Sequence, residues 1–368
     1  MRNPFKPTAG ARPPLLVGRQ DALEGFREGL EDGPGAPGLL TIFTGARGVG
    51  KTVMLTEAED AALAAGWAVV SDTATPGLIS RLAHGIQKHL DELGDGPPGR
   101  RIVAITAAGF GLTTHLPGAP TPDFRSIVTK LTTLLADHDT GLVITVDEIH
   151  AIERTELTEL AAVIQHLIRE ELPISLLVAG IPKSVSDLLN ENVSTFLRRA
   201  DRIDLHDVLI LEVEAAFAQT FSDTGVDATP AQMSTMADAT DGYPFLIQLV
   251  GYQVWRRAVD GKLTDAAVAA GIVAARRRLG STVLQASLAD LSQVDRTFLQ
   301  KMAEDDGASQ LRDIAERLGE STKYAGTYRR RLIDAGMIMD AGRGYVTFAV
   351  PQLRQYLREH AASVHGIR

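Results

Sequence analysis

A glycine-rich segment between an apolar run and a helical pattern constrains this chain more than any other feature. Residues 45–52 read Gly-Ala-Arg-Gly-Val-Gly-Lys-Thr, which is the spacing G-x-x-x-x-G-K-[ST]. The glycines let the backbone wrap so that its N–H groups point inward at phosphate oxygens, and the following helix adds its positive N-terminal dipole. An apolar run over 39–44 precedes the segment, and a helical pattern over 51–65 follows it. The sequence therefore predicts a phosphate-binding loop after a buried strand.

The end of this loop supplies the side chains that nucleotide chemistry needs. Lys51 is placed to reach the β- and γ-phosphates, and Thr52 is placed to ligate Mg²⁺. A glycine-rich turn followed by a coincidental Lys-Thr pair is the alternative, but the flanking strand and helix favour nucleotide binding. The predicted nucleotide-binding residues of the segment are Gly45, Ala46, Arg47, Gly48, Val49, Gly50, Lys51, Thr52 and Val53.

A second apolar run ends in two acidic residues. Residues 142–146 precede Asp147 and Glu148. In P-loop enzymes the first acid of such a pair holds Mg²⁺ and the second polarises the attacking water. We therefore predict Asp147 and Thr52 as metal ligands, and Glu148 and Lys51 as catalytic residues. The alternative is a helix N-terminus that favours acids, and we interpret the nearby His150 as a packing or polar residue.

Apolar runs alternate with helical patterns through the first half of the chain. Uninterrupted apolar runs separated by helices are typical of a parallel sheet covered on both faces. The glycine-rich segment 101–115 interrupts this pattern, and we expect an exposed β-hairpin there. The expected strands are 39–44, 67–71, 142–146 and 174–179, and the expected helices are 19–30, 51–65, 78–93 and 153–170.

The strand patterns stop after about Glu212, and helical patterns follow. The expected helices are 214–224, 229–240, 244–258 and 264–279, which would form a small helical domain. A third pattern begins near Leu291. The predicted divisions are an extended, proline-rich leader (1–14), a phosphate-loop core (15–212), a helical lid (213–290) and a C-terminal domain (291–368).

The C-terminal pattern predicts a winged helix-turn-helix. A helix over 310–319 has one apolar face, Ser321 is placed to cap a second helix over 322–335, and a hairpin over 336–348 follows. The helix and hairpin would present a basic surface to double-stranded DNA, although many winged helices bind protein instead. The predicted DNA-binding residues are Lys323, Thr327, Arg329, Arg330, Arg331 and Arg343.

The charge distribution restricts where nucleic acid could bind. The whole chain has a formal net charge of −9, which opposes coating of DNA by its whole surface. Residues 293–368 hold twelve Lys and Arg against ten Asp and Glu, so the rest of the chain has a net charge of −11. Within 321–346 the balance is +3. The three arginines at 276–278 form a second basic cluster, which an exposed helix end explains equally well.

Two further motifs complete a resemblance to a known superfamily. Val17-Gly18-Arg19 resembles the segment that AAA+/STAND-type P-loop ATPases place against adenine, and Gly242-Tyr243-Pro244 resembles their G-x-P motif in the lid, whose proline packs near the base. The resemblance therefore implies that Val17, Gly18, Arg19 and Pro244 also bind the nucleotide. The chain is most similar to the initiator-like and archaeal-ATPase branches. The resemblance implies a three-layer αβα ATPase core with a helical lid and a C-terminal winged helix. A helix-entry turn and a helix-N1 proline are the alternatives for the two motifs.

The chain departs from this superfamily at the usual sensor positions. The strand over 174–179 ends without a polar residue, although Lys183 or Ser184 could substitute, and the lid has Tyr243 where initiator-type proteins have an arginine. Arg198 and Arg199 are candidates for an arginine finger donated to a neighbouring subunit. An exposed helix face explains these two arginines equally well.

The favoured hypothesis is a cytoplasmic, Mg²⁺-dependent ATPase that couples its nucleotide state to DNA binding through the winged helix. The chain has no cysteine, which fits a reducing compartment, and no apolar run of membrane-spanning length. A homo-oligomer or a protein partner is compatible with this layout. The alternative is a STAND-like regulatory switch whose winged helix docks protein partners. A metabolic kinase is weakly supported because nothing suggests an acceptor pocket.

Overall fold

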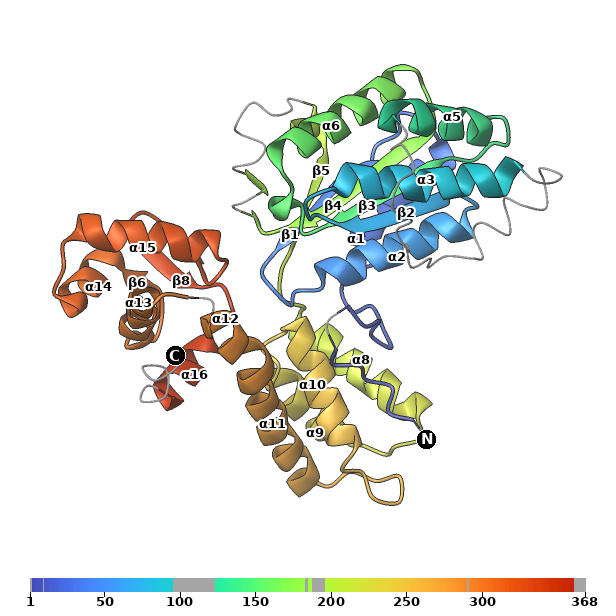
Figure 1. Cartoon of the computed structure of the whole chain (residues 1–368). Coiled ribbons are helices and arrows are strands. Elements are labelled where there is room, and N and C mark those ends of the chain that lie inside the picture. The colour runs from blue at the N-terminus through green and yellow to red at the C-terminus, as the bar shows by residue number, and fades with distance from the viewer. Residues whose placement is uncertain are drawn as a thin grey trace. The chain divides into compact units, whose positions relative to one another are not determined.

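The chain folds into two compact units, which we call the sheet unit and the helical unit (Figure 1). The computed structural model describes residues 2–8, 10–94, 123–182, 185–186, 196–289 and 291–360. The sheet unit comprises Arg19–Gly45 and Lys51–Leu205, and the helical unit comprises Met1–Gly18, Ala46–Gly50 and His206–Arg368. The β-hairpin expected over 101–115 lies outside the described residues.

A five-stranded parallel sheet forms the centre of the sheet unit, in the order β2-β3-β4-β1-β5. The four apolar strands that the sequence predicts are confirmed, with ends that shift by one or two residues. Their near-continuous burial is the reason that apolar runs identify them. The strands are β1 (Leu40–Gly45), β2 (Ala68–Thr73), β3 (Leu142–Asp147), β4 (Ile174–Gly180) and β5 (Asp201–Leu205).

Helices cover both faces of this sheet, as Figure 1 shows. Three of them (α3, α5 and α6) share one hydrophobic core with the sheet, and α1 and α2 lie on the other face. The predicted three-layer αβα arrangement is confirmed. The helices are α1 (Asp21–Asp32), α2 (Lys51–Ala64), α3 (Leu78–Gly94), α5 (Phe124–Ala136) and α6 (Arg154–Arg169).

The strand β5 was not expected from the sequence. A single 3₁₀ turn, Leu197–Arg199, leads into this strand, and Arg198 and Arg199 are exposed on the turn. β5 pairs only with β1, at the edge of the sheet, and is largely exposed. Side chains fasten it: Gly38 donates its backbone N–H to the Asp201 carboxylate at 2.9 Å, and the Thr44 hydroxyl donates to Asp204. Polar side chains therefore hold a strand that carries no apolar pattern.

The helical unit contains the four helices expected after residue 212. Threonine side chains cap two of them, because Thr229 accepts from the Gln232 N–H and Thr264 accepts from the Ala267 N–H. The last helix continues through a π-helical turn, Gly280–Leu284, into the short α12 (Gln285–Ala289). The four helices are α8 (Ile210–Asp223), α9 (Pro230–Asp238), α10 (Pro244–Trp255) and α11 (Asp265–Leu279).

The N-terminal leader is extended and packs into the helical unit. Phe5 is 3% exposed, with its ring centroid 5.9 Å from that of Phe217 and 5.6 Å from that of Phe221. A side chain at Gly251 would collide with the Phe5 ring. The Asn3 side-chain amide donates to the Tyr252 carbonyl at 3.0 Å. The leader is therefore part of a hydrophobic core.

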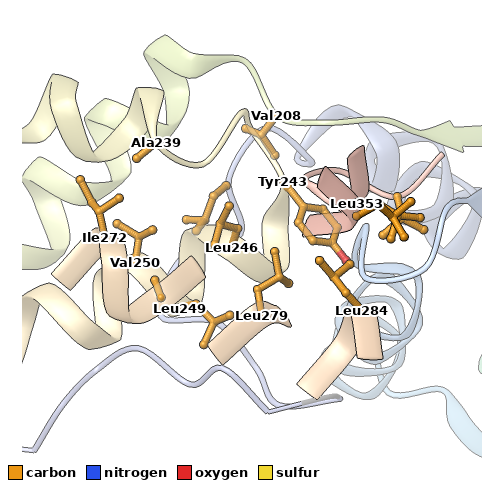
Figure 2. Packing of buried hydrophobic residues seen from close by; sticks show 14 of the residues in the cluster. Val208, Ala239, Tyr243, Leu246, Leu249, Val250, Ile272, Leu279, Leu284 and Leu353 are labelled. Carbon is orange, nitrogen blue, oxygen red and sulfur yellow. The ribbon is translucent and has the colours of Figure 1, made fainter. Parts of the chain in front are cut away.

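The C-terminal segment folds into helices and a small antiparallel sheet of order β6-β8-β7. The predicted cap is present, since the Ser321 side chain accepts from the Tyr324 N–H. Leu353 belongs to the same hydrophobic cluster as Tyr243, Leu279 and Leu284 (Figure 2), so this segment shares a core with the four helices. The elements are α13 (Gln293–Ala303), β6 (Ser309–Gln310), α14 (Leu311–Leu318), α15 (Thr322–Asp334), β7 (Ile338–Asp340), β8 (Tyr345–Phe348) and α16 (Leu353–Glu359).

Within the described residues, no helix has the length and apolar character needed to cross a membrane.

Candidate nucleotide site

The phosphate loop lies between β1 and α2, where the sequence predicts it. Gly45 is the last residue of β1, and Lys51 is the first residue of α2. Gly48 and Gly50 have φ angles of 76° and 102°, which residues other than glycine rarely adopt. The backbone can therefore turn tightly enough to enter the helix, whose N-terminal amides are the groups that bind an anion at such a loop.

Lys51 is held against the start of this loop. Its side chain is buried, at 7% exposure, and its Nζ donates to the Gly45 carbonyl at 3.0 Å. Burial of an ammonium group is costly without polar partners, so this contact stabilises the charge beside the loop. The lysine is thus positioned to neutralise phosphate oxygens bound by the loop amides.

Thr52 and Asp147 meet although they lie 95 residues apart in sequence. The Thr52 hydroxyl donates to Asp147 Oδ2 at 2.5 Å, and Asp147 Oδ1 accepts the Glu148 N–H at 2.8 Å. These two hard oxygen ligands fit Mg²⁺, which uses few protein ligands and completes its octahedron with phosphate oxygens and water. Across the described part of the chain there is no group of three or more acidic or histidine side chains able to hold a metal ion. A magnesium ion held by Thr52 and Asp147 would take its further ligands from phosphate oxygens and water.

Glu148 has an unusual backbone conformation directly after β3. Its φ angle is 52°, in the left-handed region, and its side chain is half exposed. Its Oε2 lies 3.3 Å from His150 Nδ1. Strained backbone at such a position is typical of functional sites. His150, which the sequence predicts to be a packing or polar residue, thus makes a polar contact with the predicted water-activating carboxylate.

Comparisons with known proteins identify the fold. Residues 15–178 match the AAA ATPase domain family. The structure is similar to the Walker-type ATPase of Pyrococcus abyssi, at 14% identity and a TM-score of 0.67, over 93% of this chain and 96% of that one. It is also similar to the ORC2 protein of Aeropyrum pernix in ADPNP–ADP complexes, at 17% identity and a TM-score of 0.62, over 98% and 97% of the two chains. The chain therefore shares its fold with these ATPase structures, and its AAA ATPase match lies within residues 15–178.

A second family model covers the C-terminal part of the chain. Residues 281–357 match a domain of unknown function, DUF8462. No curated protein matches the sequence. The solved structures that are similar have low sequence identity, so they establish the fold alone.

The two motifs predicted to contact adenine come together in the helical unit. A side chain at Gly18 would press against the Val208 side chain, and one at Gly242 would collide with the Val208 carbonyl. The Val208 N–H also donates to the Gly242 carbonyl at 2.8 Å. Val17 packs on the hydrophobic core of this unit, Pro244 is the first residue of α10, and Arg19 begins the sheet unit. An adenine contact by these residues stays a prediction.

A tyrosine that the sequence left without a role contacts the phosphate loop. Tyr243 is 1% exposed, and its hydroxyl donates to the Arg47 carbonyl at 3.0 Å. Both residues belong to the helical unit. Burial, and secondarily the nearby Asp207 carboxylate, raises the pKa of Tyr243, so the hydroxyl remains a proton donor throughout the physiological range.

The sensor and finger positions remain predictions. The end of β4 is apolar, since a side chain at Gly180 would press against Ile149 and Val185. Lys183 and Ser184 lie outside the described residues. Arg198 and Arg199 are exposed on the 3₁₀ turn before β5, and a neighbouring subunit would be needed to assign them a catalytic role.

The candidate DNA-binding residues divide into two groups. Arg329 forms an ion pair with Asp340, and Arg331 forms one with the buried Asp295 at 2.8 Å. Arg331 also lies over the Tyr328 ring, 5.4 Å from its centroid. These contacts give both arginines an intramolecular role. The remaining candidates, whose side chains are exposed, are Lys323, Thr327, Arg330 and Arg343.

Proposed function

We propose that this chain binds and hydrolyses ATP with Mg²⁺ at the phosphate loop and couples its nucleotide state to DNA binding. The observation that carries the proposal is the 2.5 Å hydrogen bond between Thr52 and Asp147. Thr52 directly follows the buried Lys51 in the sequence. This arrangement gathers a phosphate-binding ammonium group and two metal-binding oxygens at the end of one glycine-rich loop. The ORC2 protein, named with ADPNP and ADP, supports an adenine nucleotide as the ligand.

Each side chain of the site has a separate part in the proposed reaction. The loop amides and Lys51 bind the phosphates, while Thr52 and Asp147 hold Mg²⁺. When bound, Mg²⁺ supplies positive charge to the phosphate oxygens. Glu148 orients the attacking water and accepts its proton, and His150 restrains the Glu148 carboxylate through their 3.3 Å contact.

Replacement of Lys51 by alanine tests nucleotide binding. We expect ATP affinity to fall by at least about tenfold, because charged hydrogen bonds contribute about 1.5–3 kcal/mol each. Affinity would be measured by titration calorimetry at constant Mg²⁺. Lys88→Ala is the matched control, since Lys88 is an exposed lysine on α3 that lies 3.9 Å from Glu92. Equal ATP affinity in the native chain and the Lys51 variant would refute the proposal.

For DNA, we propose that α14, α15 and the β7–β8 hairpin form a winged helix-turn-helix. The order of these elements and the antiparallel sheet support the interpretation. The exposed Lys323, Arg330 and Arg343 would contact phosphates, whereas Arg329 and Arg331 would fix the helix in place. The net charge of +3 over 321–346 supports contact with DNA through this surface.

Electrophoretic mobility shifts with duplex DNA test this second step. We expect Arg330→Glu to weaken binding and to reduce the slope of affinity against salt by about 1, as loss of one phosphate contact does. Arg312→Glu, at an exposed arginine on α14, makes the same charge change and should have a smaller effect. Equal effects of the two variants would contradict the proposed surface.

The second candidate is a nucleotide-dependent switch that docks a protein partner. The apolar end of β4 and the internal pairing of Arg329 and Arg331 favour it, because both reduce the groups available for fast turnover and DNA contact. Absence of a salt-sensitive shift with the native protein would favour this candidate.

We further propose that the chain forms a homo-oligomer and acts in the cytoplasm. Sedimentation with and without ATP would test the homo-oligomer, and cell fractionation would test the cytoplasmic location.

A further inference from the structure

The Tyr243 ring is buried in the hydrophobic core of the helical unit, and its hydroxyl donates a hydrogen bond. The residue immediately precedes α10, and its ring belongs to the hydrophobic cluster that contains Leu246, Leu279, Leu284 and Leu353 (Figure 2). A ring buried to 1% exposure has little freedom to rotate away. The hydroxyl oxygen is therefore a fixed donor, and its acceptor is the Arg47 carbonyl of the phosphate loop.

The loop has no side chain where the tyrosine reaches it. A Cβ atom at Gly48 would collide with the Tyr243 hydroxyl and lie 2.8 Å from the ring carbon that bears it. Gly48 also has a φ angle of 76°. This glycine thus satisfies two requirements, a left-handed backbone and close approach of an aromatic ring.

The hydrogen bond from Tyr243 to the Arg47 carbonyl also determines the direction of the Gly48 N–H. No peptide bond in the described residues is cis. The C=O of Arg47 and the N–H of Gly48 therefore lie in one peptide plane and point in opposite directions. Because the carbonyl is directed at Tyr243, the Gly48 N–H is directed away from it. A phosphate loop needs its N–H groups turned to the anion and its carbonyls turned away.

We propose that Tyr243 is a positioning residue for nucleotide binding, whose hydroxyl fixes the Arg47–Gly48 peptide with its N–H available to a phosphate. This inference rests on the proposed nucleotide function. The raised pKa of Tyr243 supports it, since a phenolate would repel the carbonyl instead of donating to it.

Tyr243→Phe tests the proposal because it removes the hydroxyl and keeps the buried ring. We expect the Kd for mant-ADP to rise about 2- to 10-fold, the range for loss of one hydrogen bond. KM for ATP should rise by a similar factor with a smaller change in kcat, because Lys51, Thr52 and Glu148 are untouched. Affinities would be measured below the variant's unfolding midpoint, as recorded by circular dichroism.

Tyr252→Phe is the matched control. Tyr252 lies on α10, the helix that Tyr243 precedes, and its hydroxyl accepts from Arg256 at 3.2 Å, so the variant loses a hydrogen bond away from the loop. We expect native affinity. A Tyr243→Phe protein that melts at lower temperature but keeps native Kd and KM would show a purely structural role and overturn the inference.

The Lys51→Ala variant separates failure of this inference from failure of the proposed function. If Lys51→Ala loses affinity and Tyr243→Phe does not, the inference fails and the nucleotide site stands. If the native chain binds neither mant-ADP nor ATP, both fail together.

Discussion

The leader residue Phe5 provides the sharpest test of the packing in the helical unit. Phe5→Ala removes a ring that is 3% exposed and contacts Phe217 and Phe221. Phenylalanine-to-alanine changes at buried sites cost about 3–5 kcal/mol. The described residues of the leader contain no helix or strand, so the leader can detach without unfolding the helices, and the cost cannot exceed the free energy of docking it. We therefore expect the lower end of the range, about 3 kcal/mol.

This loss converts to a measurable melting shift. A unit of this size loses about 2–4 °C per kcal/mol, so the unfolding transition should fall by about 6–12 °C. Differential scanning calorimetry would record it, with Leu209→Ala as the control, because Leu209 is 70% exposed in the same unit and should shift the transition by less than about 2 °C. Deletion of residues 2–8 should match Phe5→Ala. Equal transitions for the Phe5 and Leu209 variants would refute the reasoning.

Two further predictions concern ion pairs of the C-terminal segment. Arg331→Ala should lower the melting midpoint by a few degrees, since it removes a charged partner from the buried Asp295, whereas Arg330→Ala, at an exposed position, should leave the midpoint within about 1 °C by calorimetry. A hydrogen bond from Arg317 lowers the pKa of Asp305 from its ordinary value of 3.8. The lowered pKa contributes stability above pH about 4, and this contribution disappears as the pH falls through the folded-state pKa. Acid titrations followed by circular dichroism should therefore show a weaker acid dependence in Arg317→Ala, and an unchanged profile would contradict the assignment.

The central sheet was predictable because its strands carry their own signal. Buried strands such as β3 are apolar on both faces, so a continuous apolar run identifies them without knowledge of their neighbours. The strand β5 has no such run. Its pairing with β1 depends on hydrogen bonds from Gly38 and Thr44 to Asp201 and Asp204, about 160 residues away, which no local pattern encodes.

The site residues that belong to short contiguous motifs were predictable from the sequence. The loop glycines, Lys51 and Thr52 occupy one contiguous segment, and Asp147 follows an apolar strand. The contact between Tyr243 and Arg47 joins residues 196 positions apart and depends on how the helical unit packs. The number of arginines available on the basic surface could not be predicted from a count of charges. Two of them form ion pairs with Asp340 and Asp295, which only the tertiary structure shows.

The buried leader imposes an order of events on synthesis of the chain. Phe5 is made roughly 210 residues before Phe217 and Phe221, and at about 5–20 residues per second the interval is about 10–40 s. All of the sheet unit emerges within that interval. The helical unit therefore cannot complete its core until the sheet unit has been translated, and the aromatic leader remains without its partners until then. Packing of the leader is therefore a late step in the folding of the chain.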